Sequence, residues 1–173
     1  MSKQADNIFR KMKKRADAII EEKLTEQLPD LIGLALKHAH IHSVTGNTMN
    51  SYAVALFHNK QFIGFYSSYQ ALGKAPMRVT LRKGERYDLP YYWGGDPSHG
   101  YTAPTGERNY WGQEEAEDFI GTHFPSRNGW AYIIVAAVDY AKYLESRGTA
   151  IVMGGLQDDL ESRGADVSDI MQG

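Results

Sequence analysis

The chain has 173 residues, of which 42% are hydrophobic and 23% charged, which suits one folded domain, alone or with a large insertion, and not a disordered protein. Its 19 basic and 21 acidic residues leave a formal net charge of −2, which argues against binding nucleic acid through bulk positive charge. The absence of cysteine excludes disulfides, cysteine nucleophiles and thiolate metal sites. The longest apolar run, residues 131–138, is too short for a membrane-spanning helix, and the polar N-terminus predicts no secretory signal.

Two helices are predicted at the N-terminus. Pro29 can open a second, short apolar helix that ends near His42, or kink the first one. The first helix, residues 5–28, carries charged residues on one face, and we expect that face to be solvated. Its other face is apolar, because hydrophobic residues recur at three- and four-residue steps: Ile8, Phe9, Met12, Ala16, Ile19, Ile20, Leu24 and Leu28.

A β-hairpin is predicted to follow. Residues 52–57 are β-branched, aromatic or small, Asn59 and Lys60 occupy the turn, and residues 61–66 return the chain. Few charges occur here, so we expect at least one face of the hairpin to be buried.

Residues 67–128 differ in composition from the rest. They hold five of the six prolines and two of the three tryptophans, and they are too long for an ordinary loop. A small hairpin turning at Lys83-Gly84 is predicted over residues 77–89, and a short helix over residues 113–122. We interpret the whole segment as a loop-rich insertion.

Regular structure is predicted again near the C-terminus. Residues 130–138 form the strongest predicted strand, residues 139–145 a turn or short helix, and residues 156–170 a helix interrupted by Gly164. The fold class is therefore α+β, with the long N-terminal helix packed on a small, mostly antiparallel sheet. Residues 1–66 and 129–173 form the core, and residues 67–128 the insertion.

Three histidines lie together in residues 38–42 (HAHIH). Alternating or four-residue spacing can place two imidazoles on one face, as a zinc site requires. Zinc needs three or four ligands, however, and the glutamate base of an HExxH motif is absent. We favour a polar helix end. A zinc-dependent enzyme stays an alternative, with His38, His40 and His42 joined by His99 or His123.

No catalytic constellation stands out. Neither GxSxG nor a phosphate-binding glycine motif occurs, and the carboxylates of residues 114–118 and 158–161 lie on polar helices, where they favour solubility. We therefore predict no enzyme activity, no catalytic residue, no cofactor and no metal.

The insertion concentrates tyrosine and tryptophan among glycine and proline. Such residues supply large contact areas at protein interfaces, and they also form small cores under loops or platforms for sugars. We favour an interface, which a small core does not exclude, and keep a carbohydrate-binding module as an alternative. The expected anchors are Tyr91, Tyr92, Trp93 and Trp111.

Two short motifs complete the pattern. Residues 45–51 (TGNTMNS) lead into the first strand, and residues 140–145 (YAKYLE) follow the last strand, with Gly148-Thr149 after them. Tyr140 and Tyr143 share a face if this segment is helical, and Glu145 can pair with a basic residue of a neighbour. With these motifs, residues 5–66 and 130–163 resemble the tail-completion or neck protein family of tailed bacteriophages, which are head–tail connectors.

This resemblance implies a structural protein of the virion, made in the host cytoplasm. It also implies assembly as a closed homo-oligomeric ring at the head–tail junction, without catalytic residues. Its partners would be copies of itself and other neck, portal or tail proteins. DNA would pass through the lumen without specific binding, and no membrane is involved. A cytosolic adaptor unrelated to phage is a further alternative.

The aromatic anchors generate a first prediction. The double substitution Tyr92→Ala, Trp93→Ala should impair assembly while the monomer stays folded, because truncating one hot-spot aromatic costs on the order of 2 kcal/mol of binding. Particle yield and circular dichroism measure the two effects. A wild-type yield of particles would remove both residues from the interface.

Overall fold

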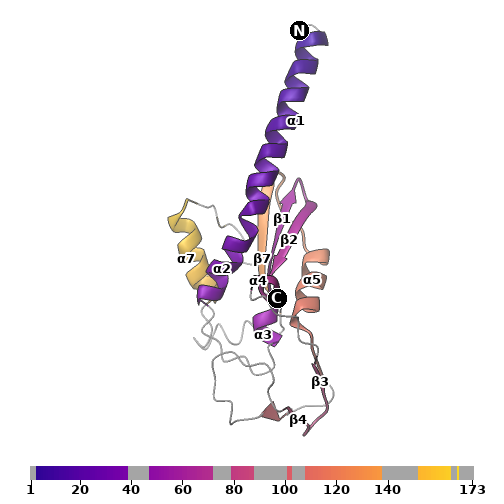
Figure 1. The fold of residues 1–173 in the computed structure, drawn as a ribbon, viewed down its shortest axis with the longest axis vertical. Helices are drawn as coiled ribbons and strands as arrows, with labels where there is room; N and C mark the ends of the chain where they lie inside the picture. Colours follow the sequence, from indigo (N-terminus) through magenta and orange to yellow (C-terminus); the bar gives the residue numbers. More distant parts are fainter. Residues whose placement is uncertain are drawn as a thin grey trace.

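The computed structural model describes residues 3–38, 47–71, 79–87, 101–102, 108–137, 152–164 and 167. They form an α+β fold in which a three-stranded antiparallel sheet lies between helices, and one long helix projects beyond it (Figure 1). The elements are α1 Lys3–Glu26, α2 Leu28–His38, α3 Asn47–Asn50, β1 Tyr52–His58, β2 Gln61–Ser67, α4 Ser68–Ala71, β3 Val79–Leu81, β4 Arg86–Tyr87, β5 Tyr101–Thr102, β6 Arg108–Tyr110, α5 Gly112–Thr122, β7 Trp130–Ala136 and α7 Val152–Ser162.

Strand β1 is the centre of the sheet, whose strand order is β2-β1-β7. Every residue from position 52 to position 57 is buried, because helices cover both faces of this strand. Its side chains alternate between two cores, as the period of a strand requires. Tyr52, Val54 and Leu56 pack with Ile32 of α2 and Leu156 of α7.

The second core lies on the opposite face of β1. Ala53, Ala55 and Phe57 pack there with Ala116 and Ile120 of α5. The small side chains at positions 53, 55 and 116 let the helix come close to the strand. Both faces of the hairpin are therefore buried at β1, which agrees with the expectation that at least one face would be.

The β1–β2 turn has the backbone of a tight two-residue hairpin. Asn59 and Lys60 both have positive φ, 51° and 67°, which matches the right-handed twist of the flanking strands. The same turn is tied to the start of β7, because Asn59 donates from its backbone N–H to the Gly129 carbonyl at 2.8 Å and accepts from the Gly129 N–H at 3.0 Å. The three strands are thus joined at this end of the sheet.

Helix α1 touches the sheet only near its C-terminal end. The Tyr132 hydroxyl of β7 donates to the Leu24 carbonyl at 2.7 Å and lies 3.1 Å from the Gln27 side-chain oxygen. Burial raises the pKa of Tyr132 to about 12, so the hydroxyl stays protonated as a donor. The chain turns at Gln27, and Pro29 lies in the first turn of α2, where its missing N–H costs nothing.

Helix α3 lies at the opposite end of the sheet and, with Ser51, makes up the described part of the TGNTMNS segment. The Ser51 hydroxyl donates to the Thr48 carbonyl at 2.7 Å, and the Ser51 carbonyl accepts from Ala137 at 3.2 Å. Helix α5 begins against this segment at Gly112, where an added Cβ would collide with the Asn47 carbonyl. The motif therefore has a structural role, because it positions the start of β1 and the start of α5.

The insertion differs from its prediction in strand pairing. The turn at Lys83-Gly84 is present, with φ of 80° at Gly84, but the strands beside it do not pair with each other. Instead β3 pairs with β6, and β4 pairs with β5, both antiparallel. The predicted hairpin over residues 77–89 is therefore wrong, because each of its strands finds a partner later in the chain.

The other predicted elements agree with the described residues. The N-terminal helices, the β1–β2 hairpin, the helix over residues 113–122 and the strong late strand are confirmed. The C-terminal helix is confirmed over residues 156–162, but it begins earlier than predicted, at Val152. The predicted turn or helix at residues 139–145 lies outside the described residues, as do residues 39–46 and 88–100.

The contact between α1 and β7 generates a second prediction. Tyr132→Phe should lower the free energy of unfolding by about 1 kcal/mol, because it removes a partly buried hydrogen bond and keeps the ring. Urea denaturation measures the change. Tyr66→Phe on β2 is the matched control, since the Tyr66 hydroxyl has no hydrogen-bond partner among the described residues. An equal loss in both variants would contradict the assigned role of the Tyr132 hydroxyl.

Candidate assembly surface

A stripe of apolar side chains on α1 faces solvent. Phe9 and Met12 are 65% and 64% exposed, and the flanking isoleucines are also exposed. The α1 stripe, as we call it, consists of Ile8, Phe9, Met12, Ala16, Ile19 and Ile20. Leu24 and Leu28, which continue the pattern in the sequence, lie instead against the core of the domain. The apolar residues of the predicted first helix therefore divide between two surfaces. Those of the α1 stripe face solvent, and those at the C-terminal end pack against the core.

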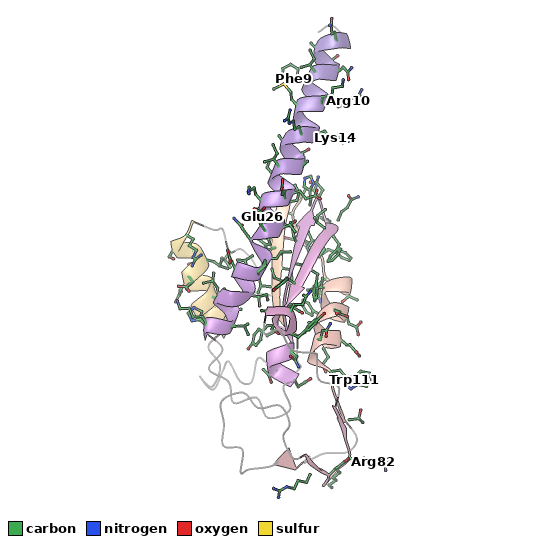
Figure 2. All side chains as sticks on the ribbon, viewed as in Figure 1. Phe9, Arg10, Lys14, Glu26, Arg82 and Trp111 are labelled. Carbon is green, nitrogen blue, oxygen red and sulfur yellow. The ribbon has the colours of Figure 1, made fainter. Side chains whose placement is uncertain are left out.

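The charges of α1 are divided along its length. Five of the six residues at positions 10–15 are basic, whereas Glu21, Glu22 and Glu26 lie toward the C-terminal end. All of these side chains are exposed, and Lys23 forms an ion pair with Glu26 at 2.7 Å. Figure 2 shows Phe9 on one side of the helix, with Arg10 and Lys14 on the other. At the free end of α1, Arg10 and Lys14 thus lie on a different side of the helix from the α1 stripe.

A second exposed apolar group lies beside the hairpin turn. Phe62 and Phe124 are 54% and 52% exposed, and we call them the hairpin patch. Both rings meet the buried Phe57 ring edge-on, with centroids 5.9 and 6.1 Å apart. Because Phe57 belongs to the core under α5, the patch lies on the α5 face of the sheet. The two exposed rings are therefore supported on one side by the core.

Helix α5 adds acidic charge on the same face of the sheet. Glu117 and Asp118 are exposed, while Ala116 and Ile120 point into the core. Glu117 accepts a hydrogen bond from Gln113 at 2.6 Å. The sequence pattern predicts only a solubilising role for these carboxylates, and it does not indicate that Phe62 and Phe124 lie on the surface.

The predicted interface anchors are only partly within the described structure. Trp111 is half-buried and lies at the N-terminal end of α5 (Figure 2), so it keeps some exposed surface. Tyr91, Tyr92 and Trp93 lie outside the described residues, as do Tyr140, Tyr143 and Glu145. The roles assigned to these residues stay predictions.

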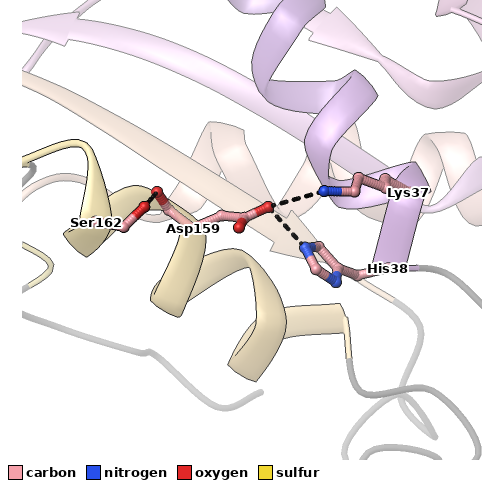
Figure 3. A network of polar contacts seen from close by, with 4 residues as sticks. All are labelled: Lys37, His38, Asp159 and Ser162. Atoms are coloured by element: carbon pink, nitrogen blue, oxygen red, sulfur yellow. Dashed lines mark hydrogen bonds and ion pairs between the residues drawn. The ribbon is translucent and has the colours of Figure 1, made fainter.

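His38 of the histidine cluster forms a bridge between two helices. Its Nε2 donates to Asp159 Oδ2 of α7 at 2.9 Å, and the Lys37 ammonium lies 3.6 Å from the same oxygen (Figure 3). The hydrogen bond from His38, and then the charge of Lys37, hold the pKa of Asp159 below its usual value. Gly155 lets the ring approach α7, since an added Cβ would lie 2.5 Å from His38 Nδ1. His38 therefore joins α2 to α7.

A metal site is not assembled by the described histidines. His123 stacks on Phe119 with centroids 3.8 Å apart, and its Nδ1 lies 2.9 Å from the Phe119 carbonyl. His40, His42 and His99 lie outside the described residues. Across the part of the chain that the structure describes, no three metal-ligating side chains gather in one place. In the same residues, no helix combines the length and apolar character needed to cross a bilayer.

Comparison with known proteins finds no relative of this chain. No family model matches the chain, and neither a curated protein nor a solved structure is significantly similar to it. Inferences about function therefore depend on the two exposed surfaces and on the motifs of the sequence.

The bridge between α2 and α7 generates a third prediction. Asp159→Asn should lower the free energy of unfolding at neutral pH, because it removes the carboxylate that accepts from His38 and attracts Lys37. A carboxyl with a depressed pKa stabilises the folded state above its unfolded pKa of about 4, and this contribution is lost as the pH falls through the folded value. The difference between wild type and variant should therefore shrink on acidification.

Urea denaturation at pH 7, 5 and 3 measures this difference. Asp158→Asn is the matched control, since Asp158 is the exposed neighbour on the same helix. A loss of stability that stays the same at all three pH values would show that the carboxylate charge is not its cause.

Proposed function

We propose that this chain is a structural protein that acts by assembling with copies of itself, as a ring at the head–tail junction of a tailed phage particle. The observation that carries the proposal is the α1 stripe, which stands away from the domain with its largest side chains in water. Exposed contiguous apolar surface is unfavourable unless another molecule covers it, and its presence marks interaction sites.

The position of the second apolar surface supports a ring in particular. The hairpin patch lies on the sheet, whereas the α1 stripe lies on a helix that projects from it. When two different surfaces of one chain bind each other between copies, the contact is heterologous, and it closes into a ring if the rotation between copies allows. The same arrangement supports copies of this chain as its first binding partners.

The phage context of the proposal depends on the resemblance of the two motifs. In the described part of the first motif, four side chains are buried at the end of the sheet, which fits a scaffold role: Asn47, Thr48, Asn50 and Ser51. Other neck, portal or tail proteins would bind the top and bottom of the ring. DNA would pass the lumen without specific binding, in keeping with a net charge of −2. No described contact favours the zinc-enzyme or carbohydrate-binding alternatives over this proposal.

The proposed function generates a fourth prediction. Deleting the gene for this chain from its phage genome should leave DNA-filled heads and separate tails, because the connecting ring is missing. In particles from the intact genome, the chain should be present at a fixed number of copies greater than two. Electron microscopy measures the first result, and quantitative mass spectrometry of purified particles measures the second.

Complementation with the wild-type gene is the control and should restore joined particles. Comparing the mass of the purified protein in solution with its copy number in the particle shows whether the ring forms before or during attachment. Infectious, fully joined particles that lack the chain would refute the proposal.

A further inference from the structure

We propose that the partner of the α1 stripe is the α5 face of a neighbouring copy, so that each subunit inserts its projecting helix beside the hairpin patch of the next. The inference rests on the proposed ring function and deepens it by naming the two surfaces in contact. It follows from three properties of the described residues: apolar surface on both sides, opposite charge, and the freedom of α1 to reach another molecule.

The apolar part of the contact joins two groups of large side chains. Ile8, Phe9 and Met12 lie near the free end of α1, and Phe62 and Phe124 lie beside the turn between β1 and β2. Each of the two phenylalanines contacts the buried Phe57 ring edge-on, so the core restricts part of its movement before binding. Aromatic anchors whose movement is already restricted lose less entropy when a partner covers them.

Basic side chains border the α1 stripe, and acidic side chains lie on α5, the helix that covers the same face of the sheet as the hairpin patch. With 3.6 residues per turn, Lys13 and Arg15 lie on the two edges of the α1 stripe. On the other surface, Glu117 and Asp118 point outward from α5 on the same face of the sheet as the hairpin patch. Charge complementarity of this kind favours the correct partner and fixes its register.

The free part of α1 is long enough to reach a neighbour. Residues 3–20 span about 27 Å at 1.5 Å per residue, and the helix is held at its other end by Tyr132 and Leu24. The division of charge along α1 also permits an antiparallel pair of two α1 helices. Such a pair is isologous and ends at two copies, so it would leave the hairpin patch uncovered and would not build a ring.

Cysteine crosslinking tests the pairing directly, because the natural chain has no cysteine. Ala16→Cys places a thiol in the α1 stripe, and Gly121→Cys places one on the open side of α5, where an added Cβ meets nothing within 4 Å. Ala18→Cys with Gly121→Cys is the matched control, since Ala18 is exposed on the opposite side of α1. The variants are introduced into particles by complementation of the deleted gene and treated with a short bis-maleimide.

The first pair should give a ladder of products from dimer to closed ring, and the control pair should stay monomeric. Dimers from the single Ala16→Cys variant would show α1–α1 pairing and overturn the inference. Failure of the first pair to crosslink in particles that contain the chain would overturn it as well, while leaving the ring function intact. Absence of the chain from wild-type particles would overturn the proposed function and the inference together.

Charge reversal provides the independent readout. Lys13→Glu with Arg15→Glu, or Glu117→Lys with Asp118→Lys, should each lower the yield of joined particles about tenfold or more, because like charges then meet across the contact. Combining the two reversals should restore most of the yield. Arg10→Glu with Lys14→Glu is the control on the opposite side of α1, and its yield should stay near the wild-type level. No restoration in the combined variant, or an equal loss in the control, would reject the proposed pairing.

Discussion

The burial of both faces of β1 is the constraint on which the rest of the structure depends. A strand whose side chains alternate between two cores needs a helix layer on each side, and α2 with α7 supplies one layer while α5 supplies the other. This requirement places the insertion helix α5 opposite the N-terminal helices, although the two are distant in the sequence. The residues before β1 are buried at the same end of the strand, where Asn47 and Ser51 lie against the start of α5.

Helix α1 lies outside this three-layer arrangement. Its last turn is bound by Leu24 and by the hydroxyl of Tyr132, and the preceding turns have no part in either core. The fold therefore does not need the α1 stripe, so the exposure of large apolar side chains there is best explained by a role outside the monomer. The hairpin patch is different, because its rings rest on Phe57 and contribute to the α5 core from its edge.

The sequence predicted the helices and the main sheet because each had a strong local pattern. The β-branched, aromatic and small residues of 52–57 and the Asn59-Lys60 turn indicated the hairpin, and the run of residues 130–138 indicated β7. Local patterns did not predict which partner a short strand would choose, so β3 and β6 were missed as a pair. Nor did they show that Asp159 meets His38 across 121 positions, or that the apolar residues of α1 divide between core and surface. The sequence offered one signal for the exposure of each phenylalanine. Phe62 lies beside a predicted turn, and Phe124 follows the end of a predicted helix.

The joint at Gln27 has a mechanical consequence. Since α1 is about 36 Å long and is held at one end, a rotation of about 10° at the joint moves its first turn by about 6 Å. A small rotation at the C-terminal end of α1 thus gives a large displacement at its N-terminal end. In the proposed ring, such a displacement would let identical subunits bridge slightly different spacings, as contacts between layers of unequal symmetry require.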